Sequence, residues 1–566
     1  MTSGKINLRP LFLDDNDAEQ VKADSMDVRS VTLTPRQLCD LELLSNGGFS
    51  PLAGFMGKTD YESVLAQMRL ADGTLWPMPV TLEVGPQEAE SLSVGDTVAL
   101  RDDEGFMLAV LDISDMFEPD RTHEARQIYG TDDAGHAGVH QLLQHTGSVC
   151  IGGTVRAVHL PTHYDFEALR HSPLELRDMF TRLGWRRVVA FHTTRPMHRM
   201  QRAICMEAAK RVSGHLLIHP VVGIARPGDV SYYARIKCYR AIEWQFPLGI
   251  AQLSLLPLAM RMAGPREALW HALVRANYGC THLIVANDHG SPPGQGFYQP
   301  YAAQELLRAH ADELQIEMVP FEKQIYVPAR KRFVAESEAK SRNDATATLS
   351  TAEFNERLTL EEPIPEWYSY PDVVDVLRTV HPPRAKLGLT LFFTGLSGAG
   401  KSTLAKIVYG RLIEDGSRPV TLLDGDVVRL NLSSELGFSK EHRNLNVRRI
   451  GFVASEITKN KGIAICAPIA PYATTRRAVR DVVSEHGAFV EIHVSTPLEV
   501  CESRDRKGLY AKARKGIIPE FTGVSDPYDV PEAPELRIDT SALSPMEAAE
   551  EIYLYLVREG YIATGD

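Results

Sequence analysis

Residues 391–403 combine an apolar run with a glycine-rich segment that could hold a phosphate group. Residues 391–393 are Leu, Phe and Phe, as in a buried strand, and residues 395–402 fit the pattern G-x-x-x-x-G-K-[ST]. Glycines at this spacing let backbone N–H groups turn toward a phosphate, while a lysine reaches the outer phosphates and a serine hydroxyl ligates magnesium. The segment therefore predicts an ATP site with magnesium, formed by Gly395, Leu396, Ser397, Gly398, Ala399, Gly400, Lys401, Ser402 and Thr403.

A second apolar run, residues 421–423, is followed by two acids and a nearby arginine, Arg429. If the run is a strand, these charged side chains lie at its C-terminal end. Phosphoryl transfer uses carboxylates to hold the metal and to accept the proton of the attacking hydroxyl. We therefore predict Lys401, Asp424 and Asp426 as catalytic residues, with Ser402 and Asp424 as magnesium ligands.

The patterns around these motifs predict an α/β multidomain fold. Short alternating runs separated by turns indicate a β-rich first region, and a region of helices alternating with apolar strands follows it. In that second region, residues 265–277 are predicted to be helical and residues 281–286 to form a strand. A small, charged, helical piece and a linker precede the phosphate loop and its α/β domain. The predicted domains are residues 1–165, 166–330, 331–385 and 386–566.

Composition limits the classes of partner and the compartment. The 566 residues carry a formal net charge of −12, which argues against a nucleic acid or an acidic membrane as the general partner. Seven scattered cysteines without a C-x-x-C pair suit a reducing compartment, so we predict a cytoplasmic protein. The longest mostly apolar stretch, residues 246–260, is shorter than the ~20 residues that a membrane span needs.

The first part of the chain resembles ATP sulfurylase. Four stretches carry this resemblance, which extends over about residues 5–380: residues 33–42, 46–52, 263–268 and 277–282. The resemblance implies a PUA-like β domain followed by a Rossmann-like nucleotidyltransferase domain. The family reaction joins sulfate to ATP and gives adenosine 5′-phosphosulfate (APS) and pyrophosphate.

The catalytic loop of that family is altered in this sequence. The family pattern Q-T-R-N-P-x-H-x-x-H is matched here only at its Thr, its Pro and its first His, and the Arg of a second loop, G-R-D-H-A-G, is Asn287. A neutral Thr194 replaces a sulfate-binding Arg, and charge-assisted hydrogen bonds are roughly twice as strong as neutral ones. We expect this half to be inactive and structural. The residues of the degraded site are His192, Thr193, Thr194, Arg195, His198, Gln201, Asn287 and His289.

Two alternatives stay open for this half. Arg195 and Arg199 could stand in for the lost cation, which would make the chain a bifunctional enzyme that produces APS and then phosphorylates it. The half could also be a regulatory module that senses a nucleotide.

Residues 389–560 resemble APS kinase. Ordered counterparts of its signatures include Gly437-Phe438-Ser439, residues 496–505, residues 507–514 and Phe521-Thr522-Gly523. The resemblance implies transfer of the ATP γ-phosphate to the 3′-hydroxyl of APS, giving 3′-phosphoadenosine 5′-phosphosulfate (PAPS) and ADP. It assigns Arg504 to the ATP adenine. The APS-binding residues that it implies are Arg429, Phe438, Arg443, Asn446, Ile469, Lys507 and Phe521.

Within that set the resemblance gives different roles to the side chains. Arg429, Arg443 and Asn446 match positions that bind the phosphosulfate, and Phe438 and Phe521 match the pair that sandwiches adenine. Lys507 and residues 510–514 resemble a mobile lid. The sequence departs from the family at Leu445, Arg506, Ser433 and Ala470, none of which removes the phosphate loop or the acids.

We therefore predict an APS kinase with a sulfurylase-like first half. Its small-molecule substrates are ATP and APS, and its metal is magnesium. Both families form oligomers, so the resemblance alone implies a homo-oligomer, either a dimer or a hexamer.

Overall fold

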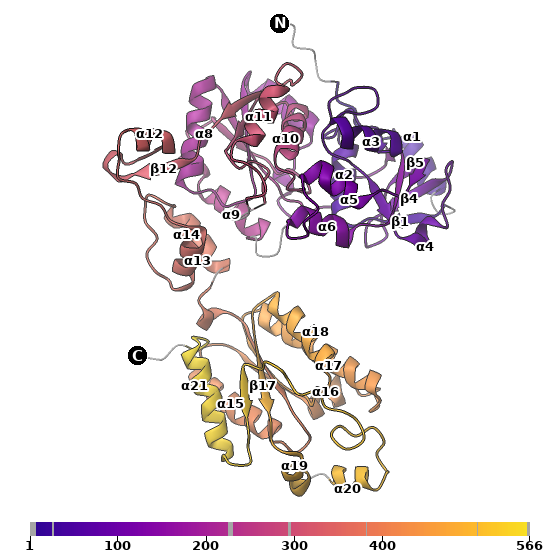
Figure 1. Cartoon of the computed structure of the whole chain (residues 1–566), viewed down its shortest axis with the longest axis vertical. Helices are drawn as coiled ribbons and strands as arrows, with labels where there is room; N and C mark the ends of the chain where they lie inside the picture. Colours follow the sequence, from indigo (N-terminus) through magenta and orange to yellow (C-terminus); the bar gives the residue numbers. More distant parts are fainter. Residues whose placement is uncertain are drawn as a thin grey trace. The chain divides into compact units, whose positions relative to one another are not determined.

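The computed structural model describes residues 7–24, 28–224, 230–292, 296–380, 382–505 and 508–562, apart from the side chains of His145 and Asp426. The chain divides into two units. The first contains residues 1–354 and 364–380, and the second contains residues 355–363 and 381–566. The two units are drawn together in Figure 1 and are described separately below.

The first unit begins with a six-stranded, mostly antiparallel sheet. Its path is β1-β4-β5-β6-β2, and β3 pairs with β6 at the same edge. Only the pair β1–β4 is parallel among the pairs of this sheet that the described residues form. The strands are β1 (Ser30–Thr32), β2 (Gly54–Phe55), β3 (Leu82–Val84), β4 (Thr97–Arg101), β5 (Met107–Phe117) and β6 (Val149–Ala157). The helices are α1 (Asp15–Asp24), α2 (Pro35–Ser45), α3 (Lys58–Gln67), α4 (Pro86–Ala89), α5 (Arg121–Tyr129) and α6 (Ala137–His145).

A parallel five-stranded sheet follows in the same unit, in the order β11-β10-β7-β8-β9. The strands are β7 (Val188–Thr193), β8 (His215–Pro220), β9 (Ala251–Leu253), β10 (His282–Val285) and β11 (Glu317–Pro320). The helices are α7 (Pro173–Arg182), α8 (Arg199–Val212), α9 (Tyr232–Ala241), α10 (Pro265–Asn277) and α11 (Ala302–Ala309), with 3₁₀ turns η1 (Glu167–Leu169) and η2 (Glu243–Gln245). Because parallel sheets place functional side chains beyond the C-terminal ends of their strands, the loops after β7 and β10 are where a site is expected.

The small piece before the linker is not purely helical. The antiparallel hairpin of β12 (Gln324–Val327) and β13 (Arg332–Ala335) joins residues on both sides of position 330, where we predicted a boundary. Strands this short, in a charged stretch, show too few alternations to be recognised from sequence. The remaining elements are η3 (Pro328–Arg330), α12 (Glu336–Ser341), α13 (Thr351–Thr359), α14 (Pro371–Val380) and, in the linker, η4 (Arg384–Lys386).

The second unit is built on a parallel five-stranded sheet in the order β15-β16-β14-β17-β18. The strands are β14 (Leu389–Thr394), β15 (Val420–Asp424), β16 (Ile463–Ala467), β17 (Ala488–Val494) and β18 (Leu536–Ile538). The helices are α15 (Lys401–Asp415), α16 (Gly425–Asn431), α17 (Lys440–Lys459), α18 (Ala473–Ser484), α19 (Leu498–Arg504), α20 (Leu509–Arg514) and α21 (Pro545–Arg558).

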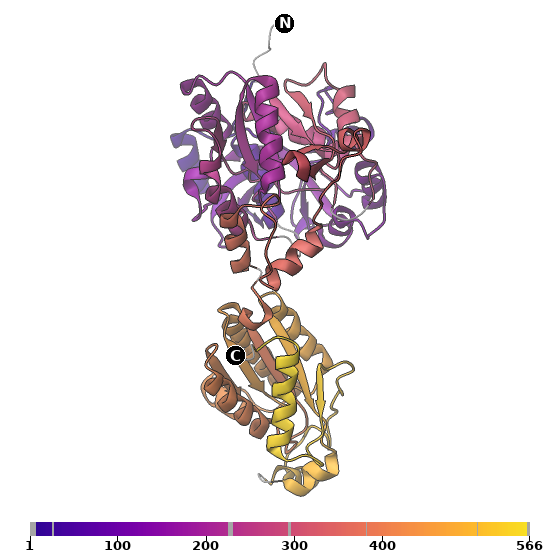
Figure 2. The ribbon, with the colours of Figure 1, turned by 90° about the vertical axis from the view of Figure 1, so that its left-hand side faces the viewer.

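Helices cover both faces of this sheet, and the central strand shows why. Successive side chains of a strand point to opposite faces. Leu391 and Phe393 pack with residues of α15 and α21, whereas Phe392 packs with residues of α17 and α18. In the turned view of Figure 2, α21 (yellow) runs across one face of the sheet. The predicted α/β multidomain fold is thus confirmed. Among the described residues, none of the helices combines the length and the hydropathy that a membrane span requires.

Candidate active site

The glycine-rich segment forms the loop between β14 and α15, as the pattern predicts. Gly395, Gly398 and Gly400 have positive φ angles of 147°, 75° and 105°. A Cβ atom on Gly395 would lie 2.5 Å from the Val494 carbonyl oxygen, so only glycine fits there. The Lys401 ammonium lies over the loop and donates hydrogen bonds to the carbonyl oxygens of Gly395 (2.8 Å) and Leu396 (2.7 Å).

A cavity of about 680 Å³ opens at this loop. Its lining brings together residues from the loop, from the end of β15, from α17 and from the segment after α20. The predicted ATP-binding residues that line it are Ser397, Gly398, Gly400, Lys401, Ser402, Thr403 and Arg504. The predicted APS-binding residues that line it are Arg429, Phe438, Arg443, Asn446, Ile469 and Phe521.

The remaining predicted site residues do not line this cavity or are not described. Gly395, Leu396 and Ala399 belong to the loop but are not among the lining residues. Lys507 lies outside the described residues. Asp426 falls in α16, and its side chain is also outside the description. Their proposed roles therefore stay predictions.

Asp424 is the last residue of β15 and is 8% exposed. It shares the cavity wall with Ser402, the second residue of α15. Mg²⁺ prefers oxygen ligands and is held by one or two carboxylates together with substrate phosphates. A carboxylate and a hydroxyl beside a phosphate loop therefore fit a magnesium ion that accompanies a nucleotide.

Aromatic and cationic side chains form the wall away from the loop. The Arg429 guanidinium carbon lies 4.4 Å from the ring centroid of Phe438, and its Nη1 donates to the Gly437 carbonyl oxygen (2.8 Å). The ring of Phe521 meets that of Tyr510 edge-on, with centroids 5.0 Å apart. The two phenylalanines predicted to hold adenine thus line one cavity, although each ring here also contacts a protein side chain.

Arg504 and residues of α20 also line the cavity. Arg504 donates to Oγ1 and to the carbonyl oxygen of Thr540, both at 2.8 Å. The Tyr510 hydroxyl donates to the Ser397 carbonyl oxygen (2.9 Å), which connects the predicted lid to the phosphate loop.

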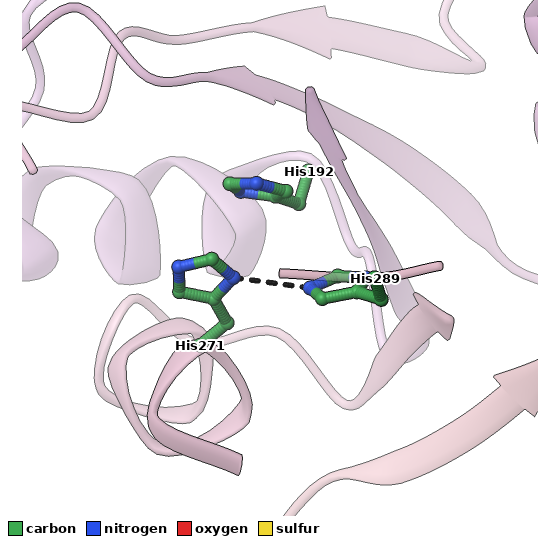
Figure 3. Close-up of side chains that lie close together, drawn as sticks. All are labelled: His192, His271 and His289. Carbon is green, nitrogen blue, oxygen red and sulfur yellow. Dashed lines mark hydrogen bonds between the residues drawn. The ribbon is translucent and has the colours of Figure 1, made fainter. Parts of the chain in front are cut away.

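In the first unit, the structure brings together two of the predicted residues with a third that sequence reasoning missed. His192 on β7, His271 on α10 and His289 after β10 lie side by side (Figure 3). His271 Nδ1 is 3.0 Å from His289 Nε2, and Arg275 Nη2 donates to His192 Nδ1 at 2.8 Å. His271 and Arg275 are four residues apart on α10, so they lie on one face of the helix. This spacing is the sequence pattern from which His271 could have been predicted as a site residue.

This histidine cluster has metal-binding chemistry but not the arrangement of a ligand set. Imidazoles that share a metal point their nitrogens at one centre. Here the rings of His192 and His271 lie against each other, with centroids 4.1 Å apart and planes tilted by 34°, and the Arg275 guanidinium donates to a His192 nitrogen. Burial, together with the neighbouring imidazoles and the Arg275 guanidinium, holds the pKa of His192 well below its usual range. We interpret the cluster as neutral imidazoles beside a buried arginine.

The other residues of the altered family loop are held by protein contacts within the same unit. His198 Nδ1 is 2.9 Å from Ser369 Oγ, and its ring lies against those of Tyr368 and Phe354. Arg199 lies over the Tyr370 ring at 4.4 Å. The backbone of Thr193, Arg195, Gln201 and Asn287 is likewise engaged in local hydrogen bonds, whereas the side chain of Arg195 is exposed and Thr194 is half-buried.

The lowered pKa of His198 predicts a pH-dependent stability of the first unit. Burial lowers the pKa of His198 to about 4, whereas an unfolded histidine titrates near 6.5. The unfolded chain therefore binds more protons between these values, and stability falls as the pH drops through that window. At pH 5.5 we expect His198 to cost about 1 kcal/mol relative to pH 8, seen as a lower calorimetric transition temperature. His198→Gln should reduce this dependence, and an equal dependence in that variant would contradict the assignment.

The three larger sheets, with the phosphate loop in the second unit and the loops after β7 and β10 in the first unit, define the class of this protein. It joins a β domain and a nucleotidyltransferase-type parallel sheet to a phosphate-loop kinase domain. Models of three families match in this order: a PUA-like domain (residues 2–160), ATP-sulfurylase (residues 167–380) and adenylylsulphate kinase (residues 387–539).

Full-length relatives share this organisation. The chain is 46% identical to a sulfate adenylyltransferase of Mycosarcoma maydis over 96% of both chains, and 46% identical to one of Emericella nidulans over 96% of both chains. A solved structure described as the hexameric APS kinase from Thiobacillus denitrificans is similar over 98% of both chains, with a TM-score of 0.81 and 40% identity. The chain belongs to the family that unites ATP sulfurylase and APS kinase domains in one polypeptide.

Proposed function

We propose that the second unit transfers the γ-phosphate of ATP to the 3′-hydroxyl of APS, giving PAPS and ADP. The observation that carries this proposal is the single cavity in which the phosphate loop faces Arg443, Asn446 and Phe521. In such a cavity the two nucleotides can bind with the γ-phosphate directed at the acceptor hydroxyl. Positioning of this kind, with stabilisation of charge, supplies most of the catalysis in phosphoryl transfer.

Each proposed role follows from the type of side chain and its place in the cavity. The backbone N–H groups of the loop and Lys401 bind the β- and γ-phosphates and offset the charge that moves to the leaving oxygen. Ser402 and Asp424 would hold magnesium, whose positive charge would offset the negative charge of the phosphates. We assign to Asp424 the uptake of the 3′-hydroxyl proton as the new P–O bond forms and the bond to ADP breaks.

Phe438 and Phe521 are proposed to stack on the adenine of APS, and Arg429, Arg443 and Asn446 to bind its phosphosulfate. Each stacked base contributes about 1–3 kcal/mol in proteins that use aromatic platforms. Arg504 is proposed to contact the ATP adenine. The hydrogen bond from Tyr510 to Ser397 holds α20 against the phosphate loop. In this position α20 would cover both nucleotides and exclude water that could hydrolyse ATP.

Asp424→Asn should lower kcat for PAPS formation by at least about a hundredfold, since loss of a general base typically costs 10²–10⁴. We expect the KM for ATP to rise by less than kcat falls, because the loop that binds the phosphates stays intact while the magnesium site keeps only a neutral oxygen at this position. Coupled ADP formation at varied ATP and APS concentrations measures both constants. Asp415→Asn, at the exposed end of α15, is the matched control. Full turnover of the Asp424 variant would contradict its role.

For the first unit we propose a structural role without sulfate activation. The support is local. His192 is a half-buried imidazole that accepts a hydrogen bond from Arg275 and whose pKa is held well below its usual range. Arg199, which could have replaced the lost cation, lies over Tyr370 and donates to the Ser369 carbonyl oxygen. A second candidate is a bifunctional enzyme that also makes APS. The name sulfate adenylyltransferase of the full-length relatives favours it.

We also propose that the chain assembles as a homo-oligomer. The support is the similar Thiobacillus denitrificans protein, which is described as hexameric. A cytoplasmic location stays a prediction from the sequence.

A further inference from the structure

Arg443, on α17, is held by a closed set of hydrogen bonds at the cavity wall. Its Nη2 donates to the Tyr472 hydroxyl (2.8 Å), and that hydroxyl donates to Asp526 Oδ2 (2.8 Å). Its Nη1 lies 3.1 Å from the same Asp526 oxygen and donates to Thr522 Oγ1 (2.8 Å). Burial and the bond to Asp526 raise the pKa of Tyr472 to about 12, so the hydroxyl keeps the proton that it donates.

The segment that supplies Asp526 also supplies the aromatic ring proposed for adenine. The backbone N–H groups of Ser525 and Asp526 donate to the Phe521 carbonyl oxygen at 3.0 and 3.1 Å, and Gly523 N–H donates to the Asp526 carbonyl oxygen at 2.8 Å. Phe521 and Asp526 are therefore the two ends of one tight turn. Through this turn, the guanidinium of Arg443 and the ring of Phe521 are fixed relative to each other.

The contacts of Arg443 with Tyr472, Thr522 and Asp526 leave two polar side-chain atoms of α17 without a hydrogen-bond partner among the described residues. Arg443 Nε and Asn446 Oδ1 are buried and make no hydrogen bond to any described residue. Both residues line the cavity and are three positions apart on α17, so they lie on one face of the helix. A buried donor or acceptor without a partner costs about 1–3 kcal/mol, and a bound polar ligand would relieve that cost.

We propose that Tyr472 and Asp526 are positioning residues for APS, a role that rests on the proposed kinase function. They hold both Nη groups of Arg443, so that the guanidinium meets the anionic phosphosulfate in one fixed orientation. The Asp526 carboxylate also offsets the cost of keeping a guanidinium in a wall where the Arg443 side chain is only 12% exposed. Neither residue contacts the phosphate loop among the described contacts, so binding of ATP does not depend on them.

Tyr472→Phe tests this role because it removes one hydroxyl and keeps the ring. We expect the KM for APS to rise about tenfold, with kcat and the KM for ATP changing by less than about threefold; tenfold is the usual effect of losing one hydrogen bond to a charged group. Asp526→Ala should raise the KM for APS further. Tyr553→Phe, on α21 and not among the residues that line the cavity, is the matched control and should behave as the wild type.

A double-substitution cycle separates positioning from a general structural role. If Tyr472 acts through Arg443, Tyr472→Phe should lower kcat/KM for APS by less than about twofold when Arg443 is already alanine. Additive effects would overturn the inference. So would an unchanged KM for APS in Tyr472→Phe, or an equal rise of the KM for ATP and for APS. A wild-type protein without any APS-dependent ADP formation would instead overturn the proposed function itself.

Discussion

Lys401→Ala should lower ADP formation from ATP plus APS by at least about a thousandfold. In the structure the Lys401 ammonium lies at the phosphate loop and donates to the carbonyl oxygens of Gly395 and Leu396. We propose that it contacts the β- and γ-phosphates when ATP is bound. Removal of one transition-state donor typically costs 10²–10³ in kcat, and a full charge at a transferring phosphoryl group contributes at least as much as a neutral donor. A coupled assay of ADP at saturating ATP and APS measures the loss.

The control for this substitution lies on the same helix. Lys406 is exposed on α15 and is not among the residues that line the cavity, so Lys406→Ala should keep normal turnover. Because the Lys401 side chain also bridges two loop carbonyls, the variant should be checked for an unchanged thermal transition of the second unit. A folded Lys401→Ala protein with normal turnover would show that the loop does not serve phosphoryl transfer.

The kinase half could be predicted well because its signals are local. The phosphate loop needs a buried strand, glycines that adopt positive φ and a helix that begins at Lys401, and all of these lie within residues 389–415. The acid at the end of the next strand is similarly local, since β15 ends at Asp424. Helix α10 spans Pro265–Asn277, as its periodicity predicts. Local patterns of this kind determine the elements and the residues at their ends.

Contacts between distant segments could not be predicted in the same way. Arg443, Tyr472 and Asp526 are separated by 29 and 54 residues, and nothing in the spacing indicates that their side chains close a hydrogen-bonded set. The same holds for Arg199, which the sequence offered as a substitute cation. The structure places it against Tyr370, the residue before α14, because the backbone N–H of Arg199 donates to the Tyr368 carbonyl oxygen and its guanidinium lies over the Tyr370 ring.

Mixing the protein with ATP, magnesium and sulfate should release no sulfate-dependent pyrophosphate. The reason is the absence of charged donors at the positions that the family pattern assigns to sulfate: Thr194 and Asn287 are neutral, and His192 is a half-buried imidazole whose pKa is held well below its usual range. Each lost donor typically costs 10²–10³ in rate, so two of them lower turnover by about 10⁴ or more if their effects are independent. Pyrophosphate release with and without sulfate measures the difference.

The proposed kinase activity of the second unit supplies the control in the same assay. The preparation that fails with sulfate should phosphorylate added APS, which shows that the protein is folded and that ATP and magnesium are adequate. The reverse reaction, ATP formation from APS and pyrophosphate, should also be absent, because an enzyme accelerates both directions of one equilibrium. Sulfate-dependent pyrophosphate release at ordinary enzyme rates would instead establish the bifunctional candidate. Arg195, whose side chain is exposed, would then be the first residue to replace in search of the substitute cation.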